Sequence, residues 1–166
     1  MKSEKKGIAL VPGSFDPITY GHIDIIKRAA EKYEQVHVAV MINSEKRYTF
    51  SLEERTKIAT VAVQSFSNVD VISSDGMLWE LARDLGADAI VKGYRNSTDL
   101  EYEKKMAEFN EAQYPNAKTV LLPSAPELVA VSSTAVREKL SDNKSLDDFL
   151  PECVLNEINK ILASRK

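Results

Sequence analysis

The sequence predicts an α/β fold in which a five-stranded parallel sheet carries helices on both faces. Short apolar runs alternate with longer amphipathic runs along the 166 residues. Such alternation is typical of strands joined by helical crossovers, which place the helices over the sheet. The first apolar run, 8–11, leads through a turn rich in glycine and proline into an amphipathic run that begins at His22. We expect a doubly wound, Rossmann-like sheet and, as the typical arrangement of such a sheet, the strand order 3-2-1-4-5.

Each expected element has its own sequence signal. Strands are expected where Val, Ile and Leu cluster, at residues 7–11, 36–42, 69–73, 88–92 and 118–122. Helices are expected near residues 22–33, 52–65, 77–85, 99–113, 133–141 and 152–163. Ser51 and Glu54 form a capping-box pattern at the start of the second helix. Gly86 can adopt the left-handed conformation after a helix, and Pro151 suits a first helical turn.

Length and composition limit the domain organisation and the partners. We expect one domain over residues 1–166, with the C-terminal helices beginning at about residue 133. A net charge of −3 argues against a nucleic-acid partner, and no run reaches the roughly 20 apolar residues of a membrane span. The first residues lack an apolar signal core, so we expect a cytoplasmic protein. Cys153 is the only cysteine, which excludes an intrachain disulfide.

The most informative segment is Pro-Gly-Ser-Phe-Asp-Pro-Ile-Thr-Tyr-Gly-His at 12–22. Gly13 and Gly21 leave room for a phosphate beside the backbone, and the helix behind them offers free N–H groups and a positive dipole end. The segment therefore predicts an anion site. His22 also has a second interpretation as a partly buried structural histidine, because it shares a helical face with Ile26.

Polar side chains follow the ends of four expected strands. These ends share one edge of a parallel sheet, which is where such sheets bind ligands. The polar residues expected there are Ser14, Thr19, His22, Lys46, Arg47, Lys92, Arg95, Ser132, Ser133, Thr134 and Arg137. Their cations would make this edge positive, as a polyphosphate site requires. Two alternatives stay open: Lys46 and Arg47 can be a solvated pair in a turn, and residues 132–134 can serve only as a helix cap.

Four motifs follow one another along the chain at a characteristic spacing. They are Gly-Ser-Phe-Asp-Pro-Ile-Thr-x-Gly-His at 13–22, Phe-Ser-Leu-Glu-Glu-Arg at 50–55, Lys-Gly-Tyr-Arg-Asn with Asp-Leu-Glu-Tyr-Glu within 92–103, and Val-Ser-Ser-Thr-Ala-Val-Arg-Glu at 131–138. The first motif is similar to that of the nucleotidyltransferase superfamily. Together the four resemble those of the bacterial phosphopantetheine adenylyltransferases, over roughly residues 7–162.

The resemblance implies transfer of an adenylyl group from ATP to 4′-phosphopantetheine, giving dephospho-coenzyme A and pyrophosphate. It also implies Mg2+ as cofactor, coenzyme A as feedback inhibitor, a homohexamer and a place as the penultimate step of coenzyme A synthesis. ATP-contacting positions of the family match Ser14, Phe15, His22, Gly93, Tyr94, Arg95, Glu103, Leu128, Val129, Ala130, Val131, Ser132, Ser133 and Thr134. Positions that hold phosphopantetheine match Ser14, Lys46, Leu78 and Lys92.

Phosphate chemistry makes the same demands on the site. A phosphate monoester has a second pKa near 6, so the attacking group is largely dianionic at pH 7 and needs no general base. The reaction instead needs cations and N–H donors, because two anions approach in line and charge grows on the α-phosphate. We therefore expect His22 to stabilise the transition state with hydroxyl donors from Ser14 and Thr19, Lys46 and Lys92 to align the acceptor, and Arg95 with Arg137 to receive the β,γ-phosphates.

Three residues depart from the family pattern. Lys92 stands where arginine is usual, which replaces a planar fork by a mobile point charge. Leu128 stands where an aromatic residue is common, and Tyr94 where leucine is common. Two other functions stay open: a nucleotidyltransferase acting on nicotinamide mononucleotide or glycerol 3-phosphate, and a nucleotide-binding regulator without turnover.

Overall fold

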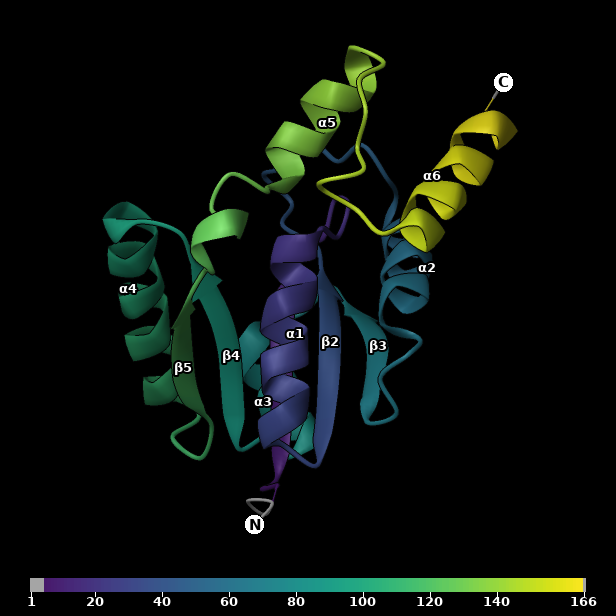
Figure 1. The fold of residues 1–166 in the computed structure, drawn as a ribbon. Helices are drawn as coiled ribbons and strands as arrows, with labels where there is room; N and C mark the ends of the chain where they lie inside the picture. Colours follow the sequence, from purple (N-terminus) through teal and green to yellow (C-terminus); the bar gives the residue numbers. More distant parts are fainter. Residues whose placement is uncertain (1–4, 166) are drawn as a thin grey trace.

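Five parallel strands form the centre of the computed structural model, which describes residues 5–165 (Figure 1). They are β1 (Ile8–Gly13), β2 (Gln35–Met41), β3 (Val69–Ser74), β4 (Ala89–Tyr94) and β5 (Lys118–Pro123). The sheet order is β3-β2-β1-β4-β5, which confirms the predicted topology. In the central strand β1, Leu10 pairs with His37 of β2 on one side and with Ile90 of β4 on the other. The strand order reverses beside β1, which opens a crevice beyond the ends of β1 and β4.

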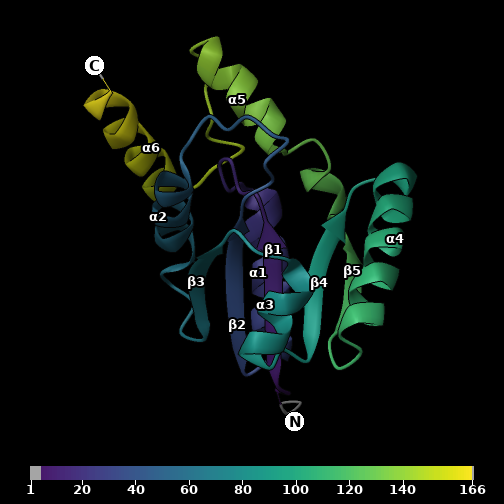
Figure 2. The same cartoon turned by 180° about the vertical axis from the view of Figure 1, so that it is seen from behind.

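Helices cover both faces of this sheet. They are α1 (Tyr20–Lys32), α2 (Leu52–Val63), α3 (Leu78–Leu85), α4 (Ser97–Gln113), α5 (Ser133–Ser141) and α6 (Glu152–Ser164), with a short 3-10 turn, η1 (Pro126–Leu128). α1 and α2 pack on one face and α3 and α4 on the other, while α6 packs against α2 (Figures 1 and 2). α5 lies beyond the carboxyl ends of the strands, so it borders the crevice and leaves the sheet faces free (Figure 1).

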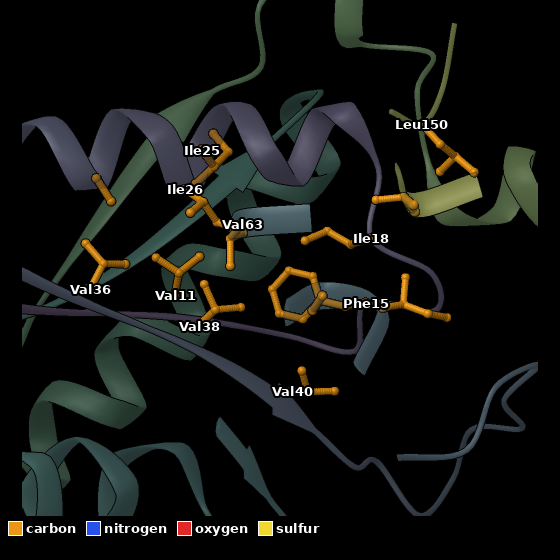
Figure 3. Packing of buried hydrophobic residues seen from close by; sticks show 14 of the residues in the cluster. Val11, Phe15, Ile18, Ile25, Ile26, Val36, Val38, Val40, Val63 and Leu150 are labelled. Carbon is orange, nitrogen blue, oxygen red and sulfur yellow. The ribbon is translucent and has the colours of Figure 1, made fainter. Parts of the chain in front are cut away.

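The core explains why β1 is apolar at successive positions. Ala9 and Val11 face the cluster under α1 and α2, whereas Leu10 faces the smaller cluster under α3. Figure 3 shows the larger cluster, in which Ile26 of α1 lies over the sheet side chains Val11 and Val36. A strand buried on both faces needs apolar residues throughout rather than alternation.

The predicted helix signals operate as expected. Ser51 Oγ accepts a hydrogen bond from the Glu54 N–H at 3.1 Å, and Glu54 Oε1 accepts one from the Ser51 N–H at 2.8 Å. Gly86 ends α3 with φ at 65°. Pro151 is the N-cap residue of α6, which begins at Glu152 as expected.

All five strands differ from the predicted bounds by one or two residues, and the largest differences are in β1 and β4. β1 and β4 each continue two residues further than expected, to Gly13 and Tyr94. Lys92, the last residue of the expected strand 88–92, therefore lies two residues before the end of β4. The turn η1 was not predicted, because three residues are too few to show a helical period.

Candidate active site

A cavity of about 600 Å³ opens at the carboxyl ends of the strands. Its lining brings together predicted site residues from the first turn to α5: Ser14, Phe15, Thr19, His22, Lys46, Leu78, Lys92, Gly93, Arg95, Glu103, Val131, Ser132, Ser133, Thr134 and Arg137. Among the residues that the structure describes, Arg47, Tyr94, Leu128, Val129 and Ala130 lie outside this lining. The ATP contacts assigned to Tyr94 and 128–130 stay predictions.

The first turn is built around Phe15. This residue has φ at 49°, in the left-handed region, which lets the chain reverse between β1 and α1. Its ring is 3% exposed and belongs to the core. The ring also packs edge-on against the His22 imidazole, with 5.0 Å between the centroids. The Phe15 side chain therefore supports His22 from the core side.

Close packing favours a glycine at position 21. A Cβ atom on Gly21 would lie 3.0 Å from the carbonyl oxygen of Val131. The absence of a side chain thus lets the segment before α5 approach the start of α1. Gly21 also belongs to the lining of the cavity.

Thr19 and His22 orient one another at the start of α1. Thr19 caps the helix: its Oγ1 accepts a hydrogen bond from the Gly21 N–H at 3.2 Å. The Thr19 backbone N–H donates to Nδ1 of His22 at 3.0 Å, and the Thr19 hydroxyl lies 3.2 Å from the same nitrogen. Because Nδ1 is the acceptor, the ring hydrogen of neutral His22 sits on Nε2. His22 therefore keeps one N–H donor for a ligand in the cavity.

The imidazole of His22 is held in its neutral form. Burial, and secondarily the positive charge of Arg95, lowers the pKa of His22 from 6.5 to about 4. At pH 7 the free protein therefore offers a neutral Nε2–H donor to the cavity. A donor of this kind can stabilise charge that develops on a phosphate oxygen.

Lys92 and Glu103 form an ion pair on the α4 side of the sheet. The Lys92 ammonium nitrogen lies 2.5 Å from Glu103 Oε2, and the two side chains are only 20% and 15% exposed. This contact connects a residue predicted for phosphopantetheine with one predicted for ATP. Glu103 Oε2 is buried and accepts no hydrogen bond from the residues that the structure describes. Its negative charge is compensated by the ammonium group of Lys92.

Arg95 and Lys46, which also line the cavity, are more exposed than Lys92. Arg95 follows β4 and lies 3.3 Å from the Asp99 carboxylate, with its side chain 44% exposed. Lys46 lies in the connection after β2, and within residues 5–165 it forms no ion pair. Both side chains can therefore turn toward an anion without breaking a buried contact.

The start of α5 docks onto the first turn. Ser132 Oγ accepts from the Ala135 N–H at 3.1 Å, which confirms a capping role. Ser133 Oγ donates to the Pro17 carbonyl at 2.7 Å, and Arg137 Nη1 donates to the Asp16 carbonyl at 2.8 Å. α5 is thereby held over the cavity that its first residues line.

Three buried charged residues among those that the structure describes were assigned no role from the sequence: Asp16, Arg55 and Glu157. Arg55 is 1% exposed and Asp16 is 3% exposed. Asp16 accepts hydrogen bonds from the N–H groups of Thr49 and Phe50, both at 2.9 Å. A signal for Arg55 was present, because it shares a helical face with the apolar Ile58 and Ala59.

This chain is similar to proteins of a known family over most of its length. Residues 10–139 match the family described as cytidylyltransferase-like. Proteins named phosphopantetheine adenylyltransferase from Clostridium perfringens and Lactobacillus helveticus are 39% and 41% identical to this chain, and each alignment covers 95% of this chain and 96% of the relative. The chain belongs to the phosphopantetheine adenylyltransferase family. A phosphopantetheine adenylyltransferase from Alkaliphilus metalliredigens is 42% identical over 92% of this chain and 98% of its own.

A solved structure supports the fold independently of the family. It comes from Vibrio parahaemolyticus and carries the name of a nicotinate-nucleotide adenylyltransferase. Its TM-score is 0.71 at 20% identity, with 95% of this chain and 93% of that chain covered. This likeness shows the Rossmann-like fold of the chain, and a fold by itself does not specify the substrate.

Proposed function

We propose that this chain transfers the adenylyl group of ATP directly to the phosphate of 4′-phosphopantetheine, without a covalent enzyme intermediate. The observation that carries the proposal is the cavity itself, which gathers one neutral imidazole donor and four cations: His22, Lys46, Lys92, Arg95 and Arg137. Family membership supports the identity of the acceptor.

In the proposed reaction the acceptor phosphate attacks the α-phosphorus of ATP. Lys46 and Lys92 neutralise and orient the attacking oxygen, which brings two anions into line. A new phosphorus–oxygen bond forms, the bond from the α-phosphorus to the bridging oxygen breaks, and the electron pair leaves with pyrophosphate. His22 donates Nε2–H to the α-phosphate, and this hydrogen bond strengthens as charge accumulates there. Arg95 and Arg137 receive the departing phosphates.

Mg2+ fits this site as part of the ATP substrate. Within residues 5–165, no group of three or more His, Cys, Asp or Glu side chains could hold a metal ion. Mg2+ commonly binds through nucleotide phosphate oxygens and waters, where it neutralises phosphate charge. Asp99 and Glu103 are carboxylates that line the cavity, and each is paired with a cation of this chain.

The resemblance also implies a homohexamer, a cytoplasmic location and inhibition by coenzyme A, and we keep these as proposals. Coenzyme A contains the phosphopantetheine arm, which supports binding in the same cavity. No helix in residues 5–165 is long and apolar enough to cross a membrane. Light scattering after size exclusion tests the hexamer, and titration of pyrophosphate release with coenzyme A tests the inhibition.

A pyrophosphate-release assay across acceptors tests the proposed function. We expect release only when ATP, Mg2+ and 4′-phosphopantetheine are all present. Nicotinamide mononucleotide and glycerol 3-phosphate serve as the competing acceptors. Turnover with either of these and none with phosphopantetheine contradicts the proposal, and binding of all ligands with no turnover favours a regulator instead.

A further inference from the structure

Arg55 joins the ends of two neighbouring strands to the start of α2. Its Nη1 donates to the Ser14 carbonyl at 2.8 Å, just beyond β1, and to the Met41 carbonyl at 3.0 Å, at the end of β2. Its Nε donates to the Phe50 carbonyl at 3.1 Å. The pairing of β1 with β2 ends at Gly13 and Val40. Arg55 therefore joins the segment after β1 to the end of β2, just beyond the last residue pair of these two strands.

Tyr48 extends this link to the turn that carries Lys46. The Arg55 guanidinium lies over the Tyr48 ring, 3.8 Å from the ring centre. The Tyr48 hydroxyl accepts a hydrogen bond from the Asn43 N–H at 2.7 Å. The Asn43 carbonyl in turn accepts from the Lys46 N–H at 3.0 Å. The backbone around Lys46 is thus connected to the buried guanidinium through one aromatic side chain.

The charge of Arg55 is compensated in a way that restricts its position. A buried guanidinium is costly unless carbonyl oxygens or a carboxylate satisfy it. Three backbone carbonyls accept from Arg55, and the buried carboxylate of Asp16 binds the backbone of Thr49 and Phe50 beside it. These three hydrogen bonds tie the guanidinium to three separate backbone segments and so restrict the movement of those segments.

We propose that Arg55 and Tyr48 are positioning residues that hold Lys46 and Ser14 in the geometry needed to bind the acceptor phosphate. Neither residue lines the cavity, whereas Ser14, Asn43 and Lys46 do. This inference rests on the proposed function, in which Lys46 aligns the acceptor. His22 and α5 are held instead by Thr19 and the first turn. Loss of the link should therefore weaken acceptor binding more than ATP binding.

The deciding variant is Tyr48→Phe, which removes the hydroxyl and keeps the ring over Arg55. Tyr33→Phe is the matched control, because Tyr33 is also partly buried but lies at the end of α1, outside the cavity lining. One neutral hydrogen bond contributes about 0.5–1.5 kcal/mol, so we expect the Kd for 4′-phosphopantetheine to rise roughly 2- to 10-fold. The Kd for ATP and the unfolding temperature should stay near the wild-type values. Calorimetric titration measures both Kd values without turnover.

A double-mutant cycle with Lys46→Ala separates positioning from general loosening. If Tyr48 acts through Lys46, Tyr48→Phe has no further effect on acceptor binding once Lys46 is removed. Arg55→Lys keeps the charge but loses the planar fork, so it should raise the same Kd at least as much. Additive effects in the cycle, or equal losses for ATP and acceptor in Tyr48→Phe, overturn the inference. Wild-type protein that binds both ligands without releasing pyrophosphate contradicts only the proposed function; failure to bind the acceptor contradicts both.

Discussion

The ammonium nitrogen of Lys92 lies 2.5 Å from the carboxylate of Glu103, which joins strand β4 to helix α4 inside the cavity. A phosphate that reaches Lys92 must bind beside this negative charge. Lys92 was predicted to hold the acceptor and Glu103 to contact ATP, so the ion pair places the two proposed subsites in direct contact. The charge of Glu103 should therefore affect the affinity for the acceptor.

Glu103→Gln should tighten the binding of 4′-phosphopantetheine. The substitution removes a negative charge next to the proposed phosphate position while keeping a similar shape. Relief of about 1 kcal/mol of repulsion corresponds to roughly a 5-fold lower Kd by calorimetry. Glu101→Gln is the control, since Glu101 lies on the same helix with its side chain 70% exposed. Weaker acceptor binding in Glu103→Gln contradicts this view and assigns Glu103 the role of orienting Lys92.

Lys92→Ala and Arg137→Ala should affect different substrates. Each removes charge-assisted hydrogen bonds of about 1.5–3 kcal/mol, or roughly 10- to 150-fold in affinity. We expect Lys92→Ala to weaken mainly phosphopantetheine binding and Arg137→Ala mainly ATP binding. Lys92→Arg should retain or improve acceptor binding, because the guanidinium fork matches phosphate.

The control for this pair is Arg83→Ala, whose exposed guanidinium contacts Asp84 and the Trp79 ring and lies outside the cavity lining. It should change neither affinity. Equal losses for both ligands in Lys92→Ala and in Arg137→Ala show one shared phosphate site. That result excludes the division of roles.

His22→Ala should lower turnover about 10²- to 10³-fold, because it removes a preorganised donor to the α-phosphate. The variant also loses the side chain that accepts from the Thr19 N–H, so we expect about 1 kcal/mol less stability. Single-turnover kinetics and thermal unfolding measure the two effects separately. A variant that unfolds much earlier yet keeps its activity when cold indicates that His22 is only structural.

Stability should respond to the lowered pKa of His22. Its folded pKa of about 4 lies below the unfolded value of 6.5, so between these values the unfolded chain binds a proton that the folded protein does not. Stability from this group is complete above pH 6.5 and falls as the pH decreases toward 4. Between pH 7 and pH 5 the loss is up to about 2 kcal/mol. This loss of stability is smaller if the imidazole ring is more exposed to the cavity.

Denaturant unfolding of wild type and His22→Gln at both pH values measures this loss. The glutamine amide does not titrate, so the stability difference between wild type and variant should shrink or reverse at pH 5. Two parallel pH curves refute the assignment. In turnover, we expect an acidic limb near pH 6 from the acceptor phosphate and none near 6.5 from His22 in the free enzyme.

The order of elements along the chain could be predicted because it depends on local patterns, and the strand order then follows a common arrangement of doubly wound sheets. Continuous apolar runs such as 8–11 mark strands buried on both faces, and side-chain caps such as Ser51 mark helix starts. The first turn and the start of α5 were identified as one site because the carboxyl ends of parallel strands share an edge. Each of these signals involves residues that are close in sequence, and the structure contains the strands and caps that they predict.

The contacts that set the site could be found only in the tertiary structure. Lys92 meets Glu103 because α4 packs beside β4, on the face of the sheet from which Lys92 projects. Arg55 reaches Ser14 and Met41 because α2 starts where two strands end. Periodicity assigns a residue to a face, but it carries no information about which side chain of another connection lies opposite. That pairing depends on how helices pack against the sheet, so the charges and hydrogen bonds of the cavity become visible only when these layers are assembled.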